Sequence, residues 1–132
     1  MPDAIATERQ LKTRAKRLRQ VRIRFLECMA NPMRSAIMQH SPMLAAQTIW
    51  AIPLEAATSG FTISMVQTDT GWHVFLSRRI DDDTVLEAAG EAQSLLKALF
   101  QVVVAAERDI DTLEADVRHQ LDQIQNVVTL AA

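Results

Sequence analysis

Residues 84–130 decide the expected fold, and they read TVLEAAGEAQSLLKALFQVVVAAERDIDTLEADVRHQLDQIQNVVTL. Apolar side chains recur there at three- and four-residue steps, a helical periodicity close to a heptad repeat. The repeating positions are Leu95 or Leu96, Leu99, Val103, Ala106, Ile110, Leu113, Val117, Leu121, Ile124 and Val128. Thr84 and Glu87 match a capping box. The pattern predicts one long acidic helix over about 84–130, about 70 Å long if it is unbroken.

A helix of that length is longer than the other expected elements can cover. The first helix is expected to pack antiparallel on residues 85–104, which leaves the distal half without a partner in this chain. We therefore expect the distal half to pair with a second copy or with a helical partner protein. The interface would contain Ile110, Leu113, Val117, Leu121, Ile124 and Val128. Continuity through Asp109–Asp111 stays open, because that stretch could restart a helix.

Upstream, the sequence predicts a basic helix over about 6–30 and short helices over about 32–58. The first helix has an apolar stripe of Leu11, Ala15, Leu18, Val21, Phe25 and Met29. Asn31-Pro32 should end it, because the residue before a proline avoids the α region. Ser41-Pro42 is expected to cap the next helix, and Pro53 to interrupt it.

Residues 61–78 change to a period of two, which predicts a β-hairpin. A four-residue loop over 68–71 would place the strongly apolar residues of both strands on one face. The expected pairs are Gln67 with Trp72, Met65 with Val74 and Ile63 with Leu76. A slip of one residue would reverse the faces, so burial should select this register.

Together these elements predict a single domain over residues 1–132 that is mainly α with one β-hairpin. The expected architecture is an antiparallel helical bundle with a long heptad-patterned C-terminal helix. With 48% hydrophobic and 23% charged residues, the composition is that of a globular protein. A single cysteine, Cys28, excludes an intrachain disulfide, and no apolar run is long enough for a membrane span. A soluble, cytoplasmic protein is expected.

The charges are divided between two segments. Residues 9–24 contain no acid and eight basic residues: Arg9, Lys12, Arg14, Lys16, Arg17, Arg19, Arg22 and Arg24. Residues 81–122 carry most of the acids, although the net charge is only −2. Three interpretations of the basic face stay open. It could be solvated, it could dock on acidic protein surface in this chain or a partner, or it could contact phosphates of DNA or RNA.

No residue pattern points to catalysis. His40, His73 and His119 are isolated, without metal-ligand spacing, and Cys28 lies in an apolar stripe as a structural thiol would. The aspartates over 81–83 are best explained by helix capping. Phosphate-loop, serine-elbow and zinc-protease motifs are all missing from the sequence. We therefore expect a non-enzymatic protein with no catalytic residue, no metal and no cofactor.

The leading functional expectation is an oligomeric interaction or scaffold subunit of a larger assembly, associating through its C-terminal helix. The first alternative is a nucleic-acid-associated accessory subunit that contacts DNA or RNA phosphates through the basic N-terminal helix. The second is a secretion-type chaperone, which small size, acidity and an α–β–α order suggest.

Overall fold

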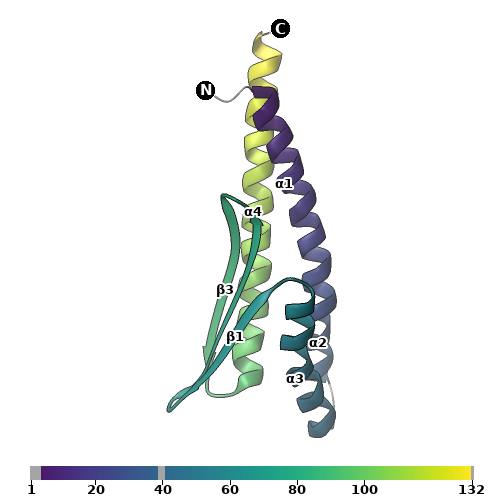
Figure 1. The fold of residues 1–132 in the computed structure, drawn as a ribbon, viewed down its shortest axis with the longest axis vertical. Coiled ribbons are helices and arrows are strands. Elements are labelled where there is room, and N and C mark those ends of the chain that lie inside the picture. Colours follow the sequence, from purple (N-terminus) through teal and green to yellow (C-terminus); the bar gives the residue numbers. More distant parts are fainter. Residues whose placement is uncertain (1–3, 39–40, 132) are drawn as a thin grey trace.

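The computed structural model describes residues 4–38 and 41–131, and the side chains of residues 7–38 and 41–127. Two long helices lie side by side and antiparallel, and a sheet packs against one of them (Figure 1). The elements are α1 (Ala4–Phe25), a π-helical turn η1 (Leu26–Ala30), α2 (Asn31–Met38), α3 (Pro42–Thr58), β1 (Thr62–Thr68), β2 (Gly71–Asp81), β3 (Thr84–Ala92) and α4 (Leu95–Ala131). The α2–α3 pair lies at the end of the molecule away from Ala4.

The fold is α+β, so the prediction of a mainly helical bundle with one hairpin was wrong. Residues 84–92 form strand β3, which pairs antiparallel with β2 in a sheet of order β1-β2-β3. Burial alternates along β3, with Thr84, Leu86, Ala88 and Gly90 facing inward. Alanine and glutamate favour helix in isolation. Here packing against α4 buries every second side chain, and the energy of that burial outweighs the local helix propensity.

The predicted capping box at Thr84 and Glu87 therefore does not form. Helix α4 starts eleven residues later, where Ser94 Oγ accepts a hydrogen bond from the backbone N–H of Lys97 at 3.2 Å. From Leu95 the helix is continuous through Asp109–Asp111 and contains 37 residues, about 55 Å. The three aspartates over 81–83 lie at the β2–β3 turn instead of a helix end.

The register predicted for the β1–β2 hairpin is confirmed. Ile63 lies opposite Leu76, Met65 opposite Val74 and Gln67 opposite Trp72. Val74 and Leu76 are buried on the inner face, while Phe75 between them is exposed on the outer face. The burial of alternate side chains therefore fixes this pairing, as argued from the sequence.

The first helix does not end at Asn31-Pro32, contrary to the prediction. Helix passes from α1 through η1 into α2 without a break, and the Asn31 N–H bonds to the Leu26 carbonyl five residues earlier. A proline ring collides with the carbonyl four residues before it in a regular α-helix. The wider π turn removes that collision and lets the helix continue. Pro53 likewise lies inside α3 without interrupting it, whereas the predicted cap at Ser41 is confirmed.

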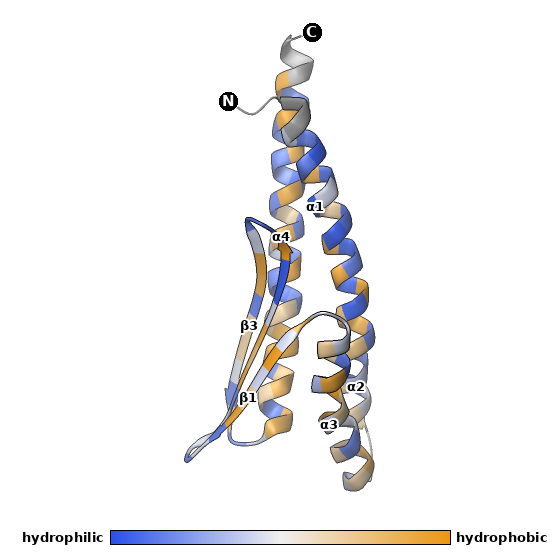
Figure 2. Cartoon of the chain, in the orientation of Figure 1, coloured by the Kyte–Doolittle hydropathy of each residue, from blue (hydrophilic) through white to orange (hydrophobic). Residues whose placement is uncertain are grey.

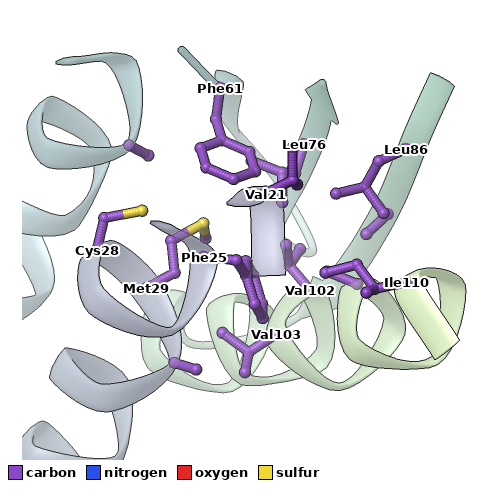
Figure 3. Close-up of a cluster of buried hydrophobic side chains, with 14 of the residues drawn as sticks. Val21, Phe25, Cys28, Met29, Phe61, Leu76, Leu86, Val102, Val103 and Ile110 are labelled. Carbon is purple, nitrogen blue, oxygen red and sulfur yellow. The ribbon is translucent and has the colours of Figure 1, made fainter. Parts of the chain in front are cut away.

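The core lies where α1, the inner face of the sheet and α4 meet (Figure 3). Figure 3 shows Phe25 and Val21 of α1 facing Val102, Val103 and Ile110 of α4, with sheet residues Leu76 and Leu86 alongside. The rings of Phe25 and Phe61 are 6.3 Å apart at a tilt of 57°. All of these side chains are buried, so one apolar cluster joins the sheet to both long helices.

Gly90 lies where the backbone of β3 closely approaches the backbone of α4. A Cβ at this position would lie 2.3 Å from the carbonyl oxygen of Ala98. Gly90 does not have a positive φ, so its role is to let strand and helix backbones touch. Strand β3 can therefore pack closely on α4 only because residue 90 lacks a side chain.

We expect Gly90→Ala to lower the free energy of unfolding by about 2 kcal/mol, because the added methyl group overpacks the β3–α4 contact. Chemical denaturation measures this change. Ala89→Val, one residue away on the exposed face, is the control and should unfold like the unmodified protein. Equal stability of Gly90→Ala and the unmodified protein would contradict the close approach.

Candidate functional site

The predicted partner interface on α4 is mostly covered by this chain. Ile110 and Val117 are buried, and Leu113, Leu121 and Ile124 are partly buried against the same core. The side chain of Val128 lies outside the described residues. Because residues 84–92 form a strand, α1 is free to cover the distal half of α4, with Leu11 and Leu18 buried. A second chain could reach Ile110 or Val117 only by displacing α1.

Part of the basic face docks on the acidic helix of the same chain. Arg22 Nε donates to Glu114 Oε1 at 2.8 Å, and a terminal nitrogen of Arg22 donates to Asp111. The hydrogen bond to Asp111 is the main cause of a raised pKa at Arg22, and the bond to Glu114 adds to it. Arg34 of α2, which was not singled out from the sequence, pairs in the same way with Glu107. Charge attraction thus reinforces the apolar α1–α4 contact.

Arg14 forms the most buried ion pair of the basic helix. Its Nε donates to Asp81 Oδ2 at 2.6 Å, and the two side chains are only 13% and 14% exposed. Burial acts to raise the pKa of Asp81, but hydrogen bonds from Arg14, from the Asp83 N–H and from Thr84 outweigh it and hold this pKa below its ordinary value. The pair ties α1 to the end of β2.

The other basic residues remain near the surface. Lys12 pairs with Glu8 and Arg24 with Glu27 inside the same helical segment, contacts that contribute little to stability. Arg17 donates to the Ile80 carbonyl at 3.2 Å. Among the described residues of α1, four exposed basic side chains have no carboxylate partner: Arg9, Lys16, Arg17 and Arg19.

Sequence reasoning missed a second surface, at the α2–α3 end. Six large apolar side chains there are each at least 47% exposed, and we call them the apolar end surface: Ile37, Met38, Met43, Leu44, Trp50 and Leu54. In Figure 2 most of α3 is coloured toward the hydrophobic end of the scale. The indole of Trp50 meets Trp72 of β2 edge-on, with centroids 6.3 Å apart. The signal was in the sequence, since Glu55 is the only charged residue of α3.

Groups with potential chemistry show no active arrangement. Cys28 is buried, and burial is the main cause of its raised pKa, so the thiol stays protonated at neutral pH. His73 lies 3.4 Å from Glu91, His119 bonds to Gln123, and His40 lies outside the described residues. Over residues 4–38 and 41–131, no three metal-ligating side chains come together, and no helix is long and apolar enough to cross a membrane.

No protein-family model, curated protein or solved structure matches this chain. The functional argument therefore starts from the two surfaces just described, the basic face of α1 and the apolar end surface.

We expect Asp81→Asn to lower the free energy of unfolding by roughly 2 kcal/mol at neutral pH, because Arg14 loses its charged partner in a mostly buried site. The pKa of Asp81 is lowered on folding, so its stabilisation is complete above the ordinary pKa of 3.8. It is lost as the pH falls below 3.8 and through the folded-state pKa. The difference between variant and unmodified protein should therefore vanish in acid.

Urea unfolding at about pH 7 and about pH 2 measures this difference. Asp82→Asn, at the exposed neighbouring position, serves as the control and should change little at either pH. A stability loss for Asp81→Asn that is the same at both pH values would show that the ion pair is not its source.

Proposed function

We propose that this protein is a non-enzymatic interaction subunit that associates with a second copy of itself through the apolar end surface. The observation that carries the proposal is the exposure of six large apolar side chains on two adjoining helices. This replaces the C-terminal helix as the expected interface, because α1 occupies the apolar stripe of α4.

The composition of α3 supports a buried role in an assembly. A helix that is apolar on all sides is normally surrounded by protein. In α3, Ile49, Ile52 and Ala56 are buried against the rest of the chain, yet Met43 and Leu54 on other sides are at least 70% exposed. Large contiguous apolar patches on soluble proteins mark interaction sites. The exposed apolar side chains at the α2–α3 end are therefore typical of a surface that binds another protein chain.

A second copy suits this surface better than a charged partner. Glu55 is the only charge on α3, so the surface offers little electrostatic means of selecting a different protein. A two-fold axis brings the same patch of both subunits together, so that each covers the other. Such pairing leaves the α1–α4 contact and the sheet unchanged.

The nucleic-acid alternative is supported by the exposed side chains of Arg9, Lys16 and Arg19. It has less support than the apolar surface, because Arg14 and Arg22 already pair with carboxylates of this chain. The secretion-type chaperone remains a prediction. On the part of the chain that the structure describes, no surface feature favours a client over a second copy.

We expect Met43→Glu combined with Leu54→Glu to reduce the native mass from a dimer to a monomer, because four charges would enter the paired surface of the dimer. Light scattering coupled to size exclusion measures the mass. Phe100→Glu combined with Val127→Glu adds the same charge to exposed positions on α4 and should leave the mass unchanged.

A monomeric unmodified protein at high concentration would refute self-association. A complex of the unmodified protein that contains nucleic acid, detected by its 260/280 nm absorbance ratio, would favour the nucleic-acid alternative instead.

A further inference from the structure

Four arginines line a cleft between α1 and β2, and none of the six residues of the apolar end surface belongs to that lining. The cleft has a volume of about 700 Å³, and its lining includes Arg17 and Arg24 of α1 with Arg78 and Arg79 of β2. Glu27 is the one acid of the lining, so the formal charge of the cleft is +3. A concave surface with this charge concentrates anions.

The way these arginines are held preserves their charge. Nη1 of Arg17 donates to the Ile80 carbonyl at 3.2 Å, and Nη1 of Arg78 donates to the Ser59 carbonyl at 2.6 Å. Nη1 of Arg79 reaches the Asp82 carbonyl at 3.4 Å. A carbonyl oxygen orients a guanidinium without neutralising it, and each guanidinium keeps further N–H donors.

Three other arginines of the same protein have carboxylate partners instead of carbonyl partners. Arg14, Arg22 and Arg34 each cross to another element and meet a carboxylate there. These pairs join helices to each other or to the sheet. The cleft arginines that cross between elements, Arg17 and Arg78, meet carbonyls instead. No carboxylate among the described residues therefore neutralises their charge, which is available to a ligand.

The backbone is shaped around Arg78. Gly60 has a φ of +90°, and a Cβ on it would lie 1.7 Å from Nη1 of Arg78. The guanidinium carbon of Arg78 also lies 5.5 Å from the centroid of the Phe61 ring, a cation–π contact. Three consecutive residues, Ser59 to Phe61, thus fix one arginine in place. The glycine is required both by its conformation and by the space that the guanidinium takes.

The cleft limits the size of its ligand. Arg17 and Arg24 are seven residues apart on α1, about 10 Å along the helix. Beyond Arg17 the surface continues into a second hollow, where Arg9 is outnumbered by Asp82, Asp83 and the paired Asp81. The carboxylates there oppose a longer polyanion. The described residues that line the arginine cleft include no aromatic ring on which a base could stack.

We propose that the cleft between α1 and β2 binds a compact phosphate-bearing anion of the pyrophosphate type, held by Arg17, Arg24, Arg78 and Arg79. Planar guanidinium groups form paired hydrogen bonds with phosphate oxygens, and four arginines line this cleft. Arg24 can contribute because its 3.6 Å contact with Glu27 is well exposed and weak. The site is independent of self-association through the apolar end surface.

Calorimetric titration of the 132-residue protein with inorganic pyrophosphate tests the proposal. Pyrophosphate should bind about tenfold or more tightly than inorganic phosphate, because it engages more guanidinium groups. Arg79→Gln, at an exposed position that should not disturb folding, should weaken pyrophosphate binding about tenfold. The matched control Arg19→Gln removes an exposed α1 arginine outside the cleft lining and should bind pyrophosphate like the unmodified protein.

A single-stranded oligonucleotide, titrated in parallel, separates a compact ligand from a polymer backbone. Weaker binding of the oligonucleotide than of pyrophosphate supports the proposal. No pyrophosphate binding, equal weakening by Arg79→Gln and Arg19→Gln, or preference for the oligonucleotide would overturn it. Gly60→Ala should weaken pyrophosphate binding by displacing Arg78, and unchanged affinity would overturn the assigned role of Arg78. These outcomes do not depend on the dimer, since its variants alter only α3 and α4.

Discussion

The structure depends on covering the apolar face of α4 along its length. The sheet covers the first half, where Leu76 and Leu86 lie against α4 residues such as Val102, and Gly90 lets the backbones touch. Helix α1 covers the distal half, where Leu11 and Leu18 are buried with Ile110 and Val117. Because two different elements share this task, a helix of 37 residues can belong to a small single chain. The hydrophobic burial along α4 sets the place of α1 and of the sheet.

The charge division of the sequence has a structural meaning that differs along α1. Arg22 joins α1 to the acidic part of α4, and Arg14 joins it to Asp81 at the end of β2. Apolar burial drives the packing of α1, and these ion pairs fix its orientation relative to α4 and the sheet. Arg17 and Arg24 of the same helix line a cleft together with Arg78 and Arg79 of β2. Some arginines of α1 thus form ion pairs that hold the fold together, and others are exposed to solvent.

The apolar end surface and the arginine cleft differ in how visible they were in the sequence. The sequence of α3 contains one charge in 17 residues, which is a readable sign of a helix apolar on more than one side. The cleft could not be found in the same way. Arg17 and Arg78 are 61 positions apart in sequence, and Gly60 makes room for Arg78 only because β2 returns past it.

By itself, the sequence determined the features that depend on local period. The alternation over 61–78 was sufficient to predict the strand register, because a one-residue slip would bury the wrong face. The three- and four-residue steps after Leu95 likewise predicted helix on both sides of Asp109–Asp111, although the sequence left open whether the helix continues through that stretch, as it does. Tertiary structure decided the secondary structure of segments where local propensity and burial favour different conformations. Residues 84–92 contain helix-favouring alanines, yet they form β3 because they pair with β2 and bury alternate side chains against α4. Asn31-Pro32 lies within a helix because a π turn and burial of Met29 and Met33 outweigh the proline. Burial against distant residues supplies that energy, and the local pattern does not contain it.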